Sequence, residues 1–279
     1  VFFMDMKPCM VKYTGEVDYF LDPNDYSKKL NGEPSDISNV NYQGNAMVQV
    51  PKIYWKIVSV NDVALVYISN YRLDDDFNCW SHINNQGEEI DFCYMPIYNG
   101  SLVNETLRSL SGQSPISFKT AQSEINYALK NNKSNDILWY TSTFSDWMLI
   151  NLLLILIGKS VDSKSVFGQG NNKSYVDSSN TGILNTGSMN NKGMFYGSTD
   201  NKIGVKVFGM EHWWGNLWKR IAGYVYSNGK QKIKMTYGTE DGSTIDGYNL
   251  DGSGYIEIPD SKCRGTSGGY INKAICNRY

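Results

Sequence analysis

The side chains best suited to catalysis are few in this chain of 279 residues. Only two histidines occur, His82 and His212, so histidine-based triads and zinc sites have few groups to draw on. Residues 265–269 spell Gly-x-Ser-x-Gly around Ser267, the spacing of a hydrolase nucleophile, but no histidine follows this serine. We therefore interpret the segment as a flexible Gly/Ser loop. His212 is expected to donate one hydrogen bond within a packed turn.

Acidic residues near the carboxyl end are the candidate metal ligands. Asp241, Asp246 and Asp251 recur every five residues, and each is followed by Gly. This spacing does not match a known type of calcium loop, and Asp-Gly is a strong signal for a turn. Turns are the preferred interpretation, so no cofactor is expected, and Ca²⁺ remains the alternative.

The cysteines do not form an obvious disulfide framework. Their number, five, is odd, and no Cys-x-x-Cys pair occurs. We expect free and mostly buried thiols, as in a protein made in a reducing cytosol and released by lysis. Bridges between Cys79 and Cys93, and between Cys263 and Cys276, stay open alternatives.

Charge and hydropathy exclude two classes of partner. The formal net charge is −2 and no basic cluster occurs, which argues against nucleic acid as a partner. The strongly apolar run from Trp147 to Ile157 is shorter than the ~20 residues that span a bilayer, so no membrane insertion is expected. The run predicts a buried helix with Ser145 as its N-cap and Gly158 as its stop.

The composition is that of a folded protein with a polar, weakly charged surface. Aromatic residues make up 13% of the chain and charged residues 19%. Asn, Ser, Gly and Tyr dominate the second half, a mixture that recognition surfaces use. An AT-rich genome would produce the same enrichment, and the composition alone does not distinguish the two interpretations.

Short β patterns and two helices indicate an α+β fold. Residues 10–20 predict a hairpin, and residues 47–60 with 63–69 predict a second that turns at Asn61-Asp62. The other predicted elements are a strand over 89–98, a helix over 120–130 capped by Thr120, and strands over 205–210, 219–226, 231–236 and 255–258. Residues 158–204 read as an unusually long loop. We divide the chain into a β-rich amino-terminal region, 1–72, and a second domain, 73–279.

A tryptophan cluster carries a family resemblance. Three of the seven tryptophans fall within residues 213–218, around Gly215-Asn216-Leu217-Trp218. This segment resembles the Gly-Asn-Val-Trp-Glu-Trp signature of the C-type-lectin-like domains in formylglycine-generating enzymes and in the variable proteins of diversity-generating retroelements. The resemblance implies a twisted antiparallel sheet with two flanking helices and long loops. It also implies that Gly215 and Asn216 form a turn in which the Asn216 side chain bonds backbone, and that Trp218 lies in the core.

Residues 138–150 are similar to the strand, turn and helix of the same family, whose helix bears an inward tryptophan, here Trp147. The amino-terminal half resembles a different group of proteins. Residues 7–11, 19–26 and 47–56 are similar to tail and receptor-binding proteins of bacteriophages and prophages of Firmicute-type hosts. Together these matches span most of residues 7–223.

The two resemblances imply a non-enzymatic adhesin of a phage tail or tail-like particle, made in the bacterial cytoplasm and extracellular after release. It would bind a host cell-surface glycan or protein and assemble with other tail or baseplate proteins. We expect a homo-oligomer, a trimer, whose exposed apolar surface lies in the amino-terminal β region.

The ligand face is predicted on Tyr- and Asn-bearing loops, because Tyr rings and amides match the apolar faces and hydroxyls of sugars. Its expected residues are Tyr248, Asn249, Tyr255, Arg264, Tyr270 and Asn272, with Trp213 at the rim. These residues could instead be solvated turns or subunit contacts.

Two functions from other classes stay open. A formylglycine-generating type of oxidase would use a cysteine pair, for which Cys263 and Cys276 are suitably placed, although Lys219-Arg220 replace the Glu-Trp of the motif. The second is a structural baseplate subunit. The diversified positions of retroelement variable proteins fall in the last segment of the lectin fold, and the sequence leaves open whether that segment continues past Tyr279.

Overall fold

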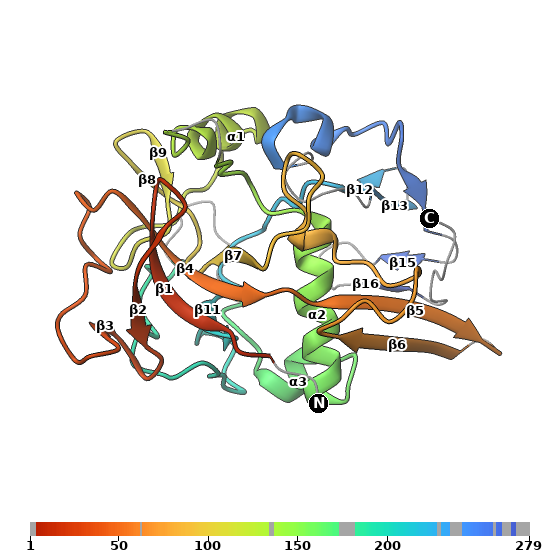
Figure 1. Ribbon diagram of the computed structural model, residues 1–279, viewed down its shortest axis with the longest axis horizontal. Coiled ribbons are helices and arrows are strands. Elements are labelled where there is room, and N and C mark those ends of the chain that lie inside the picture. The colour runs from red at the N-terminus through yellow and green to blue at the C-terminus, as the bar shows by residue number, and fades with distance from the viewer. Residues whose placement is uncertain are drawn as a thin grey trace.

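The computed structural model describes residues 4–61, 63–133, 137–172, 182–227, 230–234, 242–258, 261–263 and 269–271. Its main sheet is antiparallel with the strand order β3-β2-β1-β4-β7 (Figure 1). The strands are β1 (Lys7–Lys12), β2 (Val17–Asp22), β3 (Asp25–Lys29), β4 (Gly44–Pro51) and β7 (Phe92–Pro96). The hairpin predicted over residues 10–20 is confirmed, with Met10 opposite Tyr19.

The centre of this sheet is buried on both faces. β4 reads Gly-Asn-Ala-Met-Val-Gln-Val-Pro, and every residue before Pro51 is buried. Val48 and Val50 face the main core together with Met10 of β1, whereas Met47 packs with Cys9 on the opposite face. Alternating side chains of a strand point to opposite faces, so a strand that is buried along its length must be covered on both.

A second hairpin projects from the body (Figure 1). Its strands β5 (Tyr54–Val60) and β6 (Val63–Ser69) pair antiparallel from Tyr54 opposite Ser69 to Val60 opposite Val63. The predicted turn begins at Asn61 with a left-handed φ of 50°, while Asp62 lies outside the described residues. The first strand of this prediction began at residue 47, which is wrong, because β4 ends at Pro51 and β5 begins at Tyr54.

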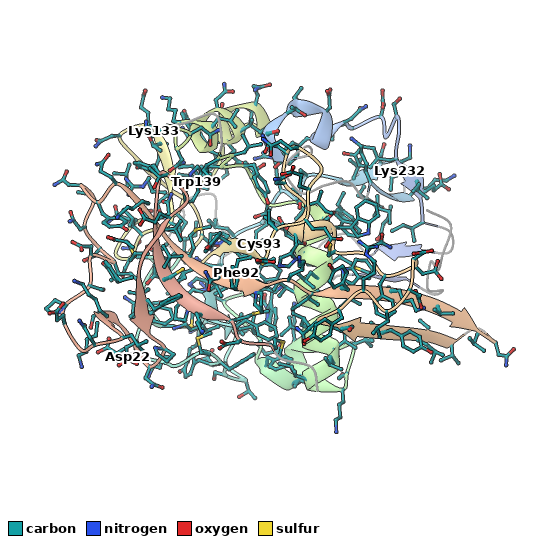
Figure 2. The ribbon with its side chains drawn as sticks, in the orientation of Figure 1. Asp22, Phe92, Cys93, Lys133, Trp139 and Lys232 are labelled. Carbon is teal, nitrogen blue, oxygen red and sulfur yellow. The ribbon has the colours of Figure 1, made fainter. Side chains whose placement is uncertain are left out.

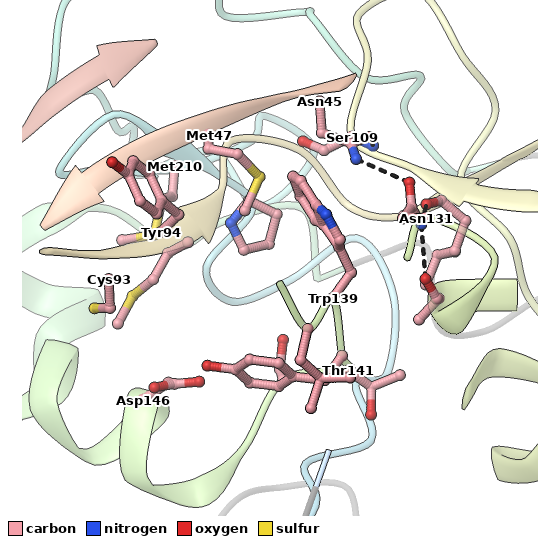
Figure 3. Close-up of a pocket in the computed structure, with 18 of the residues that line it drawn as sticks. Asn45, Met47, Cys93, Tyr94, Ser109, Asn131, Trp139, Thr141, Asp146 and Met210 are labelled. Carbon is pink, nitrogen blue, oxygen red and sulfur yellow. Dashed lines mark hydrogen bonds between the residues drawn. The ribbon is translucent and has the colours of Figure 1, made fainter. Parts of the chain in front are cut away.

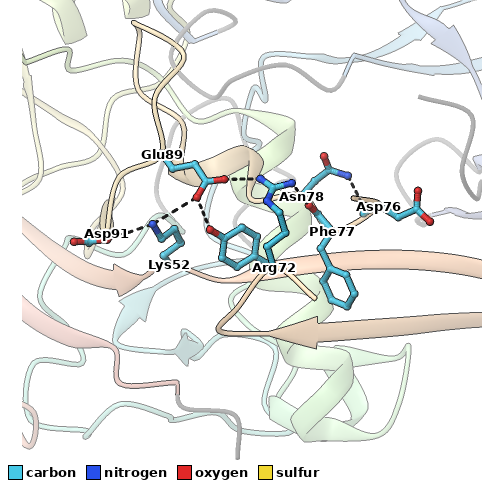
Figure 4. Close-up of polar contacts among 8 residues, drawn as sticks. Lys52, Arg72, Asp76, Phe77, Asn78, Glu89 and Asp91 are labelled. Atoms are coloured by element: carbon cyan, nitrogen blue, oxygen red, sulfur yellow. Dashed lines mark hydrogen bonds and ion pairs between the residues drawn. The ribbon is translucent and has the colours of Figure 1, made fainter. Parts of the chain in front are cut away.

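The base of this hairpin, which we call the β5–β6 hairpin, is tied to the body by ionic contacts around Glu89 (Figure 4). The Tyr54 hydroxyl and the Arg72 guanidinium donate to the two Glu89 oxygens, and the Lys52 ammonium lies 3.6 Å from Oε2. Lys52 also pairs with Asp91 at 3.3 Å. The hydrogen bonds from Tyr54 and Arg72 lower the pKa of Glu89 to about 2.

Helix α2 (Phe144–Gly158) packs against the main core through Leu149, Ile150 and Leu153. The expected apolar helix is therefore confirmed, but its N-cap is Thr143 and not Ser145. Thr143 has extended backbone and accepts from the Asp146 amide at 3.3 Å. Gly158, the predicted stop, is instead the last residue of the helix, and the left-handed cap that follows it is Lys159. Among the described residues no helix has both the length and the apolar character needed to cross a membrane.

Two smaller helices accompany α2. Helix α1 (Ala121–Leu129) begins at Thr120, whose hydroxyl accepts from the Ser123 amide, as the sequence predicted. Helix α3 (Ser163–Phe167) falls within the segment that we expected to be a loop, and the Asp162 side chain caps it. A five-residue helix is too short for periodicity to reveal.

The remaining strands are short and antiparallel. They are β8 (Ser101–Val103), β9 (Thr106–Arg108), β10 (Lys206–Val207), β11 (Met210–Glu211), β12 (Tyr224–Ser227), β13 (Lys230–Ile233), β14 (Ile256–Glu257), β15 (Ser261–Cys263) and β16 (Gly269–Ile271). The single strand predicted over 205–210 is wrong, because Phe208 and Gly209 have positive φ and fold β11 back onto β10. β12 begins at Tyr224 and not at residue 219. The α+β class with mainly antiparallel sheets is confirmed.

Lys206 of β10 is completely buried. Its ammonium lies 3.5 Å from the centroid of the Tyr26 ring and donates to the Met189 carbonyl at 3.0 Å. Burial lowers the pKa of Lys206 to about 8, and the nearby Glu211 carboxylate opposes this shift. The contact between Tyr26 and Lys206 thus packs β3 against β10.

The division at residue 72 stays a prediction. Both the main sheet and its core include residues from each side of that position, such as Met10 before it and Leu153 after it.

Candidate functional site

A cavity of about 640 Å³ lies between the main sheet and the tryptophan-rich segment 210–221. Figure 2 shows open space beside Cys93 and Trp139, and Figure 3 shows the walls. Its aromatic lining comprises Phe92, Tyr94, Tyr98, Trp139, Tyr140, Trp147, Trp213, Trp218 and Tyr248. Rings from five separate parts of the chain therefore converge on one space.

Asp146 supplies a carboxylate to the cavity wall, from the first turn of α2 (Figure 3). Its Oδ2 accepts from the Thr143 hydroxyl at 2.9 Å, and its buried Oδ1 has no hydrogen-bond partner among the described residues. Burial raises the pKa of Asp146 to about 6, and the hydrogen bond from Thr143 opposes the shift. The position is fixed by the helix start, because Thr143 and Asp146 form a reciprocal cap.

Two neutral groups lie near this carboxylate. Burial raises the pKa of the Cys93 thiol and of the Tyr140 hydroxyl well above their usual values, and the charge of Asp146 adds to both shifts. Cys93 comes from β7, and Tyr140 from the segment that precedes α2. Both groups stay protonated at neutral pH, so they can act as hydrogen-bond donors there.

The tryptophan-rich segment forms the facing wall. The rings of Trp147 and Trp213 stack with centroids 6.5 Å apart and planes 20° apart. Lys219 donates to the carbonyls of His212 and Trp213, and its ammonium lies 5.6 Å from the Trp213 ring. The Lys219 side chain is exposed and lines the open space, and partial desolvation of its ammonium by the cavity walls lowers its pKa.

Most polar groups at the far end of the cavity already have partners inside the protein. Asn131 donates to the carbonyls of Leu107 and Ala128, and its oxygen accepts from Asn45 at 3.0 Å (Figure 3). The Trp139 indole donates to the Tyr13 carbonyl at 3.2 Å. These contacts satisfy the polar groups of Asn131 and Trp139 from within the protein.

The Gly215-Asn216 turn has the structural role that the resemblance implied. Asn216 is buried with a φ of 68°, donates to the Leu184 carbonyl at 3.1 Å and accepts from the Leu184 amide at 2.8 Å. A Cβ atom on Gly215 would lie 2.8 Å from the Asn171 nitrogen, so a glycine is required there. The prediction that Asn216 bonds backbone from a turn is confirmed.

Trp218 is not a core residue. Its side chain is 67% exposed and lines the cavity, so the expectation of a buried staple is wrong. After the turn at Gly215-Asn216 the chain runs along the surface and presents Trp218 outward. Trp147 and Trp213 are half-buried, and both also line the cavity.

The structure brings only part of the predicted ligand face to the cavity. Tyr248 lines it and shares a short hydrogen bond with the Thr141 hydroxyl, and Trp213 lines it as well. Tyr255 and Asn249 lie outside its lining: the Tyr255 hydroxyl donates to the Gly247 carbonyl at 2.7 Å, and the Asn249 oxygen accepts from the Asp251 amide. Arg264, Asn272 and the Tyr270 side chain fall outside the described residues.

His212 differs from its prediction. It is completely buried, and neither ring nitrogen has a hydrogen-bond partner in the part of the chain that the structure describes. Burial lowers its pKa to about 3, so the ring is neutral. It packs against Gly204, where a Cβ would lie 2.4 Å from the imidazole.

Free thiols are confirmed for Cys9, Cys79 and Cys93, which are all buried. A Cys79–Cys93 bridge is therefore not formed, and the Cys263–Cys276 alternative lies outside the described side chains. Within the described ranges no group of three His, Cys, Asp or Glu side chains could hold a metal ion. Asp251 accepts from the Ser253 amide in a turn, as the Asp-Gly pattern suggested, and Asp241 is outside these ranges.

Sequence reasoning missed Asp146, Tyr140 and Lys219 as cavity residues. A local signal existed for the first, because Thr143-x-x-Asp146 has capping-box spacing directly before an apolar run. Tyr140 and Lys219 carry no such signal, since only the tertiary fold brings their segments together. Comparisons of the chain with protein-family models, curated proteins and solved structures found no match.

Proposed function

We propose that this chain is a non-enzymatic recognition protein that binds a cell-surface glycan in the cavity described above. The observation that carries the proposal is the convergence of Trp147, Trp213, Trp218 and Tyr248 on one open space. Aromatic faces pack against the apolar C–H faces of sugar rings, and the rigid rings lose little entropy on binding. The volume of about 640 Å³ is in the range of ligand sites in proteins.

The setting that we propose is the tail of a phage or a tail-like particle, attached to neighbouring tail proteins. It rests on the resemblance of residues 7–11, 19–26 and 47–56 to tail proteins. The C-type-lectin-like fold proposed for the second part rests on the resemblance of the tryptophan cluster. The mixed α+β architecture is compatible with that fold. Of the ligands left open, a glycan is the one we propose, because sugar rings present the apolar C–H faces that an aromatic lining accommodates.

The oxidase alternative uses Cys263 and Cys276, whose side chains lie outside the described residues, and the described thiols give it no support. Burial raises the pKa of Cys9 to about 12 and that of Cys79 to about 11, so both are protonated at neutral pH, and a thiol must ionise to act as a nucleophile.

The test is binding of the purified chain to an array of cell-wall polysaccharides from Firmicute-type bacteria. Trp218→Ala removes an exposed ring from the cavity mouth, and Tyr71→Ala removes an equally exposed ring (74%) that does not line the cavity. We expect Trp218→Ala to weaken binding about three- to tenfold, the range of one aromatic contact, and Tyr71→Ala to leave it unchanged. Equal binding by both variants would exclude the cavity as the site. Absence of binding to any polysaccharide would overturn the proposed function.

A further inference from the structure

Asp146 is a carboxylate without a cationic partner in the part of the chain that the structure describes. None of the ion pairs among the described residues includes it, and no lysine or arginine contributes to its pKa. The neighbours that face it are neutral: Ser81, Cys93, Tyr140 and Thr143. Removing an ionised carboxylate from water is costly unless a countercharge is supplied. The cavity therefore has a site of uncompensated negative charge in its wall.

Aromatic rings surround the same space. Tyr140 lies near enough for the charge of Asp146 to raise its pKa, and Trp147 follows Asp146 on α2 and stacks on Trp213. All of them line the cavity. The faces of such rings carry partial negative charge and attract alkylated ammonium groups, most strongly where water is excluded. Rings and carboxylate thus favour the same kind of ligand group.

The cavity's own lysine does not fill this role. Lys219 is held by the carbonyls of His212 and Trp213, and neither Lys219 nor Asp146 contributes to the pKa of the other. Arg220, also in the lining, pairs with Glu124 at 2.6 Å. A neutral sugar would contact the rings but would leave the carboxylate without a countercharge.

We infer that the cavity binds an alkylated ammonium group, enclosed by Tyr140, Trp147 and Trp213 and neutralised by the carboxylate of Asp146. This inference rests on the proposed function and specifies it, because the ammonium group would be a substituent of the surface glycan. The ligand class is then a polymer that carries choline-like or other N-alkylated amines, not a plain neutral polysaccharide.

Protonation of Asp146 gives the site a characteristic pH dependence. The groups facing the carboxylate are Ser81 from the 3-10 turn η1 (Trp80–His82), Cys93 from β7, Tyr140 from the preceding segment and Thr143 from the helix cap. Raised pKa values keep the Cys93 and Tyr140 groups neutral across the acidic range, so Asp146 is the group that titrates there. If only the ionised form binds, affinity at pH 5 is about tenfold lower than at pH 7.5.

The experiment is calorimetric titration of the full chain with tetramethylammonium chloride and with choline chloride, at constant ionic strength, with potassium chloride as the blank. Asp146→Asn removes the charge and keeps the shape. Asp22→Asn is the matched control, because Asp22 ends β2 remote from the cavity (Figure 2), and an amide oxygen there can still accept from the Asn24 backbone amide. We expect saturable binding by wild type and by Asp22→Asn, and at least a tenfold loss in Asp146→Asn.

Each other outcome overturns the inference. Wild type that binds neither ammonium probe contradicts it, as does an Asp146→Asn variant that binds them normally. If Asp146→Asn does not fold by thermal melting, the wild-type pH series decides, and equal affinity at pH 7.5 and pH 5 counts against the carboxylate. The polysaccharide array is read separately. Retained glycan binding without ammonium binding rejects this inference alone, whereas loss of both rejects the proposed function.

Discussion

The side chain of Asn216 holds together two segments that are distant in sequence. It bonds both backbone groups of Leu184 and accepts from the side-chain amide of Asn171 at 3.1 Å, while its own backbone adopts a left-handed conformation. A buried side chain with three hydrogen bonds leaves several polar groups unsatisfied when it is removed.

Replacing Asn216 with Gly separates the contribution of its side-chain hydrogen bonds from that of its left-handed backbone conformation. Glycine adopts a φ of 68° without strain, so the loss of stability reports the hydrogen bonds alone. We expect Asn216→Gly to lower the free energy of unfolding by about 2–4 kcal/mol in urea denaturation, since each unsatisfied buried group costs about 1–3 kcal/mol. A loss below about 0.5 kcal/mol would show that the turn does not depend on these bonds.

Trp218 should behave in the opposite way. Its ring is two-thirds exposed, so truncation to alanine removes little buried area. We expect Trp218→Ala to change the free energy of unfolding by less than about 1 kcal/mol, against the ~3–5 kcal/mol typical of a core tryptophan. A loss of about 3–5 kcal/mol in the free energy of unfolding, measured by the same urea titration, would show that Trp218 is a core residue after all.

Among the elements, the Glu89 network determines how firmly the β5–β6 hairpin is attached. Isolated two-stranded hairpins are marginally stable in water, so contacts at the base matter more than cross-strand pairs at the tip. Tyr54 belongs to β5, Arg72 follows β6 and Lys52 precedes β5, and all three contact one carboxylate (Figure 4).

The Glu89→Gln variant tests this role through its pH dependence. The pKa of Glu89 falls from 4.5 to about 2 on folding, so its stabilisation is fully present above pH 4.5 and disappears as the pH falls through 2. With a side chain about one-third exposed, we expect a loss of about 1–2 kcal/mol at pH 7 that shrinks towards zero near pH 2. Denaturation of both proteins across this range measures the difference, and a pH-independent difference would indicate lost packing instead.

The elements that the sequence predicted correctly are those with strong local signals. Thr120 and the helix it caps, the hairpin at Gly15 and the hairpin at Asn61 all follow from turn chemistry and periodicity. The failures occurred where local signals compete. Ser145 and Thr143 are both reasonable caps, and only the parallel bridge of Thr143 with Ala222 shows which residue has extended backbone.

The candidate site was only partly accessible to the same reasoning. The tryptophan cluster identified one wall, because three indoles in six residues are unusual in any sequence. The opposite wall, with Cys93 and Tyr140, is assembled by strand pairing and helix packing over long sequence separations. The exposure of Trp218 could not be read from its type, since large aromatic residues occur both in cores and in binding sites.

At the scale of the whole molecule, the projecting hairpin carries a group of exposed apolar residues, as an assembly contact would. Its exposed residues include Val60, Val63, Leu65, Val66 and Tyr67. Uncovered apolar strands with open edges tend to pair with other chains. This agrees in position with the apolar surface expected in residues 1–72, and the trimer itself stays a prediction.

The double substitution Val63→Lys, Leu65→Lys tests that contact, because it adds two charges to one face of β6. We expect wild type to be oligomeric by light scattering at micromolar concentration and this variant to have a smaller mass. Leu30→Lys with Leu250→Lys is the control, since both residues are exposed (66% and 78%) and lie outside the hairpin. A monomeric wild type, or an unchanged mass in the hairpin variant, would contradict the expectation.

The buried ammonium of Lys206 has a consequence for chemical labelling. Amine-reactive reagents need an accessible, unprotonated nitrogen, and this one is enclosed by the Tyr26 ring and the Met189 carbonyl. Lys230, by contrast, has a side chain that is 58% exposed and can be acylated in the native protein. Acylation of Lys206 therefore requires the core around it to open. The extent of acylation at Lys206 relative to Lys230 then measures how often that opening occurs.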